Sequence, residues 1–336
     1  MKIIKKIMLL ILFVFVVLAF LEIIPVAPKY KDENPWLISD GQHPIVGLSV
    51  GDDTVYPENT IYTFEQLASS SDIFNVELRL TGDDQLITSR DASIKRLTNV
   101  DETIRDVSET ELIKYNYAVN FENVDGVKAF ADLTDESTLY EKMVPANLEY
   151  LFQAYPNKEF ILEIRDTDDT VYKHAVDKLT DLINTYNMKD QVIVSTDVSK
   201  VRDYHAPYNE SVTSLPAKES IKFLSLNLMY LDFFYTPKDA VLILSYNEPL
   251  NEEEIKYLDK LPDFLKTRLV NDNGNGIIYS NFVNKNIIKE AHRHNVAVYV
   301  SGVEDEDVMR SLIQMGVDGI ITNKPEQLSE IIDSIN

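Results

Sequence analysis

Two apolar runs flank a helix start near the beginning of the polar part of the chain, and this arrangement limits the possible folds more than any other feature. Residues 45–50 are a short apolar run closed by the sequence GDD, and in residues 73–80 (IFNVELRL) polar and apolar side chains alternate. Both runs are typical of β-strands. The sequence PENT at residues 57–60 predicts a helix start between them, with Asn59 or Thr60 as N-cap. The predicted order is strand, helix, strand.

The same alternation continues to the end of the chain. Further strands are predicted at residues 160–165, 191–195, 210–213, 240–245, 296–300 and 319–322. Apolar residues with helical periodicity lie between several of them, at residues 175–183, 221–231 and 283–291. Eight strand and helix units predict an α/β fold that closes into a (β/α)8 TIM barrel. A doubly wound open sheet is the alternative, but the sequence has no GxGxxG nucleotide-binding fingerprint to support it.

An apolar segment precedes this region. Residues 1–6 carry three lysines, and residues 7–26 are apolar apart from Glu22. Twenty helical residues span roughly 30 Å, the thickness of a bilayer core. We therefore expect a tail at residues 1–6, a transmembrane anchor at 7–28, a linker at 29–40 and the barrel at 41–336. A cleaved signal peptide is the alternative, but the sequence lacks a good cleavage signature.

Charge and composition restrict the location and the partners. Because the lysines precede the apolar segment, we expect a single-pass protein of the cell membrane with a cytoplasmic N-terminus and an extracytoplasmic barrel. The absence of cysteine excludes a lipid-modified cysteine anchor and any disulfide. With 55 acidic and 32 basic residues the formal charge is -23, so nucleic acid is not an expected partner.

Several short motifs resemble, in order and spacing, those of the glycerophosphodiester phosphodiesterase family. They are PENT at 57–60, LTGDD at 80–84, SRD at 89–91, KRLTN at 95–99, FILEIR at 160–165 and VDGIITNKP at 317–325. The resemblance implies a TIM barrel with a small subdomain inserted after the second strand, here at residues 92–143. It also implies metal-dependent hydrolysis of glycerophosphodiesters to glycerol 3-phosphate and an alcohol.

Both histidines that exchange protons in that family are replaced here. Aligned on the motifs, their positions fall on Ser49 and Arg90. A guanidinium stays protonated at any workable pH and cannot act as a general base. Each general acid or base contributes about 10² to 10⁴ fold to a rate. We therefore expect a catalytically degenerate site and assign no catalytic residue.

The metal site that the resemblance implies is also weakened. The three ligand positions fall on Asn75, Glu77 and Glu163, so one negative charge is lost. Oxygen ligands of this kind suit calcium or magnesium. We expect the divalent cation to bind weakly or to be absent, and we expect Arg90 to pair with Glu77 or Glu163.

Two further residues have two interpretations each. Arg165 replaces a lysine of the family pattern and is the candidate to bind a substrate phosphate, with an ion pair to Asp166 or Asp168 as the alternative. Trp36, the only tryptophan, lies near the linker and is expected at the membrane interface or under the barrel.

Three functions remain open. The first is a degenerate barrel that binds a glycerophosphodiester headgroup, a glycerophosphate polymer or a protein partner. The second is an active, metal-dependent phosphodiesterase with a rearranged site, for example Glu77, Glu163 and His205. The third is a structural envelope protein with an unrelated α/β fold.

Overall fold

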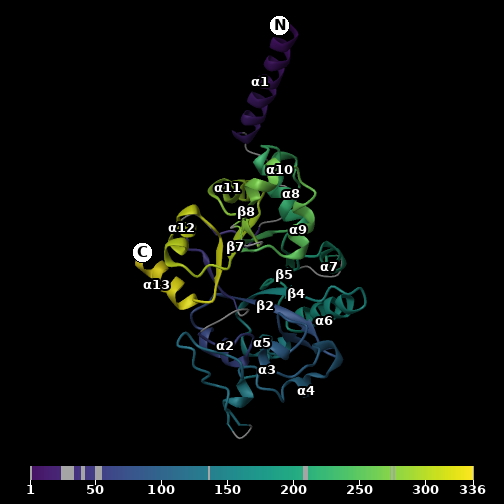
Figure 1. Ribbon diagram of the computed structural model, residues 1–336, viewed down its shortest axis with the longest axis vertical. Helices are drawn as coiled ribbons and strands as arrows, with labels where there is room; N and C mark the ends of the chain where they lie inside the picture. Colours follow the sequence, from purple (N-terminus) through teal and green to yellow (C-terminus); the bar gives the residue numbers. More distant parts are fainter. Residues whose placement is uncertain are drawn as a thin grey trace.

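Eight parallel strands close into a barrel in the computed structural model of the chain (Figure 1). The structure describes residues 2–23, 34–38, 42–49, 55–134, 137–206, 211–272, 274 and 277–335. The barrel strands are β1 (Ile45–Ser49), β2 (Ile73–Leu80), β4 (Glu159–Ile164), β5 (Val192–Ser195), β6 (Val212–Thr213), β7 (Val241–Pro249), β10 (Ala297–Ser301) and β11 (Gly319–Thr322). They are ordered β6-β5-β4-β2-β1-β11-β10-β7, and a parallel bridge between Ser214 and Val241 joins β6 to β7. The predicted TIM-barrel fold is confirmed.

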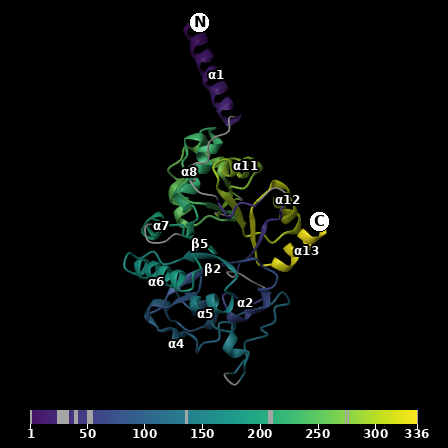
Figure 2. The ribbon, with the colours of Figure 1, turned by 180° about the vertical axis from the view of Figure 1, so that it is seen from behind.

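Helices follow most of the strands and cover the outside of the barrel (Figures 1 and 2). They are α2 (Ile61–Leu67), α5 (Leu148–Ala154), α6 (Val171–Thr185), α7 (Ser199–His205), α8 (Ala217–Leu228), α9 (Glu252–Leu258), α10 (Asp263–Leu269), α11 (Lys285–Arg293), α12 (Glu306–Met315) and α13 (Pro325–Ile335). Of the two N-caps predicted for the first of them, the structure has Thr60, whose hydroxyl accepts a hydrogen bond from the Thr63 amide at 3.3 Å.

Three short strands were not predicted. Strand β3 (Leu86–Thr88) pairs antiparallel with the end of β2. Strands β8 (Val270–Asp272) and β9 (Ile278–Asn281) form a hairpin that pairs with the extension of β7 beyond its predicted end at residue 245. The predicted turn at residues 51–53 lies outside the described residues, as does most of the linker at 29–40.

Residues 92–143 form short helices beside β3. These are α3 (Lys95–Thr98), η1 (Ile104–Asp106), α4 (Glu109–Leu112) and η2 (Tyr140–Lys142). Their buried side chains make a small core of their own, which includes Ile94, Ile104, Leu112 and Tyr117. The limits of the predicted inserted subdomain stay a prediction.

The first helix, α1 (Lys2–Ile23), projects from the barrel (Figure 1). Its described apolar side chains are exposed; Leu9 and Phe13 are examples. Within the described residues, no helix combines the length and the apolarity that a membrane crossing needs. The predicted transmembrane anchor is therefore not confirmed.

A short segment before β1 closes the amino end of the barrel. Trp36 is only 2% exposed and packs with residues that begin the strands, among them Ile73 and Ile161. Asn34 Nδ2 donates hydrogen bonds to the Ala240 and Asn295 carbonyls at 2.8 and 2.9 Å. Of the two positions expected for Trp36, the structure has the one under the barrel.

We predict that Trp36→Ala lowers the free energy of unfolding by about 3 to 5 kcal/mol, because it opens a large cavity in a closed apolar cluster. Urea unfolding followed by circular dichroism measures this loss. Trp36→Phe is the matched control and should cost less, since it keeps an aromatic ring. Equal stability of Trp36→Ala and the native chain would show that the segment does not seal the barrel.

Candidate functional site

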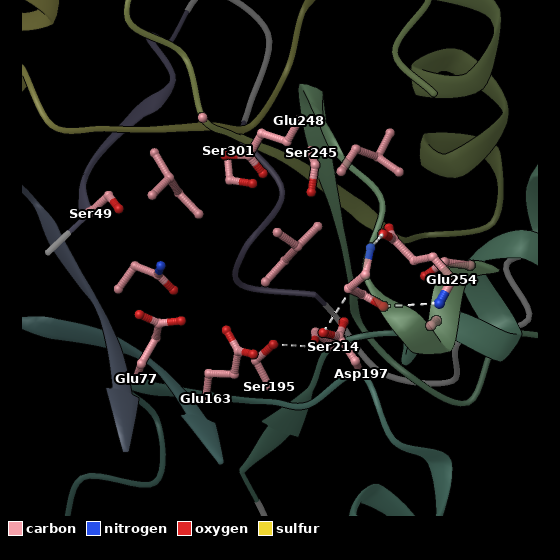
Figure 3. Close-up of a pocket in the computed structure, with 18 of the residues that line it drawn as sticks. Ser49, Glu77, Glu163, Ser195, Asp197, Ser214, Ser245, Glu248, Glu254 and Ser301 are labelled. Atoms are coloured by element: carbon pink, nitrogen blue, oxygen red, sulfur yellow. Dashed lines mark hydrogen bonds between the residues drawn. The ribbon is translucent and has the colours of Figure 1, made fainter. Parts of the chain in front are cut away.

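A cavity of about 570 Å³ opens at the carboxyl ends of the barrel strands (Figure 3). Polar side chains at the strand ends line it: Ser49, Asn75, Glu77, Glu163, Ser195, Ser245 and Ser301. Loops that follow the strands add Arg90, Arg165, Asp197, Ser214, Asn251, Glu304 and Asn323, while β7 adds Glu248 and α9 adds Glu254. This is the end of a TIM barrel where ligands bind.

Strand register places the predicted site residues in a row across one side of this cavity. Ser49 lies opposite Asn75 in the pairing of β1 with β2, and Glu77 lies opposite Glu163 in the pairing of β2 with β4. Because alternate residues of a strand point to the same side, Asn75 and Glu77 both face inward. None of the described residues of 92–143 is among those that line the cavity.

Two arginines neutralise the two glutamates of this row. Arg90 Nε lies 3.1 Å from Glu77 Oε2, which confirms one of the two pairings expected for Arg90. Arg165 Nη1 lies 2.6 Å from Glu163 Oε1, and its Nε lies 3.7 Å from Glu77 Oε1. Arg165 therefore bridges both glutamates.

Neither aspartate that was proposed as a partner for Arg165 takes that role. Asp166 instead forms an ion pair with Arg79 at 3.0 Å. Asp168 accepts hydrogen bonds from the Thr170 amide and hydroxyl at 2.9 and 2.6 Å, before α6.

The electrostatics of the glutamate pair follow from burial. Glu77 is almost fully buried, and its pKa is raised by loss of hydration and then by the charge of Glu163, although Arg90 and Arg165 oppose the shift. The charges of Glu163 and Glu77 in turn raise the pKa of Arg165. The guanidinium groups thus offset the repulsion between two close carboxylates.

The residues present do not fit a divalent cation. A calcium or magnesium ion takes six or more oxygen ligands. Here both carboxylates already bind guanidinium groups, and Asn75 is neutral. Among the described residues, no group of three or more histidine, cysteine or acidic side chains is placed to hold a metal ion.

Further acidic residues line the cavity and were not predicted. Asp197 follows β5, and its Oδ2 accepts a hydrogen bond from Asn251 Nδ2 at 3.0 Å (Figure 3). Burial and, to a smaller extent, the charges of Glu163 and Glu254 raise the pKa of Asp197 to about 8, although Arg165 opposes the shift. In the sequence, the one sign that Asp197 could belong to the site is its position two residues after the predicted strand at 191–195.

Glu248 also lines the cavity, from the extension of β7. Gly302 makes room for it: a Cβ at this position would lie 2.1 Å from Glu248 Oε1, and the glycine has φ of +75°. Burial raises the pKa of Glu248. Sequence reasoning missed Glu248 because it ended the strand at residue 245.

His205 does not take part in the site. It belongs to α7, is 0% exposed and is not among the residues that line the cavity. Burial lowers its pKa to about 4, so it is neutral at ordinary pH. The prediction that His205 joins Glu77 and Glu163 in a rearranged site is therefore wrong.

The raised pKa of Asp197 predicts a pH-dependent stability. Between its ordinary pKa near 3.8 and its folded value of about 8, the folded chain holds a proton that the unfolded chain releases. Stability should therefore fall as the pH rises through this window. Asp197→Asn should be more stable than the native chain at pH 9, by at least about 1 kcal/mol, and the gain should shrink towards pH 4.

Urea unfolding at pH 5, 7 and 9 measures this difference. The exposed Asp181→Asn on α6 is the control and should change stability by less than about 0.5 kcal/mol. A gain from Asp197→Asn that does not vary with pH would contradict the protonation of Asp197 in the folded state.

Comparison with known proteins gives concordant results. A sequence model described as the glycerophosphoryl diester phosphodiesterase family matches residues 235–327. A glycerophosphodiester phosphodiesterase of Caldanaerobacter subterraneus is 24% identical over 84% of this chain and 95% of its own. The lysophospholipase D GDPD1 of Rattus norvegicus is 21% identical over 83% of each chain.

Solved structures share the fold. The glycerophosphoryl diester phosphodiesterase domain of an uncharacterized Mycobacterium tuberculosis protein superposes with a TM-score of 0.64 at 12% identity, over 86% of this chain and 99% of that one. A glycerophosphodiester phosphodiesterase of Agrobacterium tumefaciens superposes with a TM-score of 0.57 at 15% identity, over 86% of this chain and 100% of that one. The chain is therefore similar in sequence to glycerophosphodiester phosphodiesterases and shares the barrel fold of that family.

Proposed function

We propose that this barrel binds a glycerophosphodiester headgroup at its mouth without hydrolysing it efficiently. One observation carries the proposal: Arg165 bridges Glu77 and Glu163, and Arg90 binds Glu77, so the carboxylates at the metal positions are neutralised by the chain itself. The relatives bear names of active phosphodiesterases, and this chain differs from the family pattern at the positions that carry the chemistry.

Hydrolysis of a phosphodiester needs a group that removes a proton from the attacking oxygen and a group that protonates the leaving oxygen. Ser49 and Arg90 hold the two family positions for these groups. A guanidinium cannot accept a proton, and a serine hydroxyl is a poor base without a partner that activates it. This side of the mouth is suited to hydrogen bonding and not to proton transfer.

The charge of the cavity restricts the ligand. Its described lining has two arginines, which already bind glutamates, and six acidic residues: Glu77, Glu163, Asp197, Glu248, Glu254 and Glu304. A polymer with a negative charge on every unit would be repelled by this excess of acid. A headgroup with one phosphate and one ammonium group suits it better, with the phosphate near the two arginines and the ammonium near the acidic residues of the lining.

A second candidate function rests on Asp197. With a pKa of about 8, this carboxyl group is protonated at neutral pH and can donate a proton to a leaving oxygen. The chain would then be a phosphodiesterase with a rearranged site that uses no histidine. Its activity would fall as the pH rises above about 8, because Asp197 would lose the proton that it donates.

The location is a further part of the proposal. We infer that α1 anchors the chain in the cell membrane with the barrel outside. Support comes from the full sequence, in which residues 7–26 are apolar apart from Glu22 and follow three lysines, and from the exposed apolar side chains of α1.

We predict that the purified chain does not measurably hydrolyse zwitterionic or anionic glycerophosphodiesters between pH 6 and 9, with calcium or magnesium present. Release of glycerol 3-phosphate measures this. Because two acid–base groups are replaced, the rate should lie at least about 10³-fold below that of an intact relative. Turnover by the native chain that Asp197→Asn abolishes would favour the second candidate and refute the first.

We also predict that the native chain binds calcium only weakly and that Asn75→Glu combined with Arg90→His raises the affinity at least tenfold, about 1.4 kcal/mol. The two changes add a carboxylate and remove a positive charge beside Glu77. Isothermal titration calorimetry measures the affinity. Asn184→Glu with Lys173→His makes a similar change of charge on the exposed side of α6 and should have no such effect. Tight calcium binding by the native chain would contradict neutralisation by the arginines.

A further inference from the structure

The turn after α8 exposes a group of large apolar side chains. Met229, Tyr230 and Phe234 are 41%, 52% and 67% exposed, and the centroids of the Phe233 and Phe234 rings lie 3.9 Å apart, with the rings tilted by 36°. The 3-10 helix η3 (Asp232–Phe234) holds the second half of this turn. Exposed apolar groups of this kind mark surfaces that contact a partner or a membrane.

Tyr230 occupies a backbone position that favours glycine. Its φ is +58°, the left-handed conformation that often ends a helix. The Tyr230 amide donates to the Asn227 carbonyl at 3.0 Å, and the Leu231 amide donates to the Leu226 carbonyl at 2.8 Å, which terminates α8. A bulky, exposed aromatic residue at such a position departs from local preference, and departures of this kind concentrate at functional places.

This turn lies under the barrel, where the chain arrives from α1. Asp232 pairs with His294 at 3.3 Å, and the next residue, Asn295, accepts a hydrogen bond from Asn34. Eleven residue steps separate Ile23, the end of α1, from Asn34, and an extended chain of that length reaches about 40 Å at most. In both views α1 leaves the molecule at the end that carries α8 and α11 (Figures 1 and 2), and Figure 1 shows α10 at the same end.

The surface of the turn carries no exposed acid, although the chain has a formal charge of -23. The exposed residues between 229 and 238 are Met229, Tyr230, Phe234, Thr236 and Lys238. Asp232 in this segment and Asp239 just after it are both buried and paired, Asp232 with His294 and Asp239 with Arg202 at 2.7 Å. The turn itself therefore adds no exposed negative charge beside an anionic lipid surface.

We propose that Met229, Tyr230 and Phe234 insert into the interfacial layer of the bilayer that holds α1. The barrel then rests on the membrane by its amino end, and its mouth opens away from the lipid. This inference rests on the membrane location given under Proposed function. Aromatic side chains favour the membrane interface, and burial of apolar groups there increases the membrane affinity of an anchored protein.

The test uses the full chain, whose lack of cysteine permits single labels. Leu9→Cys, Phe234→Cys and Val124→Cys are each labelled with a polarity-sensitive fluorophore and reconstituted in vesicles of phosphatidylcholine and phosphatidylglycerol. Val124 is the matched control, because it is 74% exposed and belongs to the 92–143 segment, beyond β3. We expect a blue shift and quenching by lipid-borne nitroxides at positions 9 and 234 and neither effect at position 124.

The possible outcomes distinguish a failure of docking at the turn from a failure of the membrane location. Quenching at position 9 without quenching at 234 overturns the docking of the turn and leaves the anchor in place. No quenching at position 9 overturns the membrane location and the docking together. Equal quenching at positions 124 and 234 would contradict the proposal that the turn, and not the 92–143 segment, faces the membrane.

Tyr230→Gly separates membrane contact from a structural role. Glycine adopts the left-handed conformation freely, so the thermal midpoint should stay the same or rise. Quenching of the label at position 234 should fall at least twofold. Unchanged quenching in this variant would show that Tyr230 does not contact lipid.

Discussion

The bridge from Arg165 to Glu77 and Glu163 is the interaction on which the barrel mouth depends. Register brings the two carboxylates together on neighbouring strands, where they would repel each other in a partly dehydrated space. A bound cation is one solution to this repulsion, and a pair of guanidinium groups is another. The chain uses the second, so its mouth keeps its shape from its own side chains.

Most of the barrel and half of the mouth could be predicted from the sequence. Most of the strands contain short apolar runs because both faces of a parallel barrel are buried, and such runs can be recognised in the sequence alone. Ser49, Asn75, Arg90 and Glu163 were identified by alignment to motifs, and the structure brings all four to one cavity. Their chemical roles are a matter for experiment.

The other half of the mouth could not be predicted, because its residues have no motif and depend on tertiary packing. Glu248 faces the cavity only because β7 continues past residue 245 along an antiparallel hairpin, and because Gly302 leaves space. His205 was misjudged because it belongs to the helix α7, which places its side chain in the interior of the protein. Periodicity over seven residues is too short to show which side of a helix is buried.

The segment that contains Trp36 affects how the barrel would respond to a pulling force. Its contacts reach the starts of β7 and β10 through Ala240 and Asn295, and Asp318, just before β11, accepts a hydrogen bond from the Ile38 amide. A force applied to the N-terminus would therefore load three adjacent strands at once, in shear, instead of peeling one strand from an edge. A barrel tethered in this way would resist tension along its tether better than a domain held by a single terminal strand.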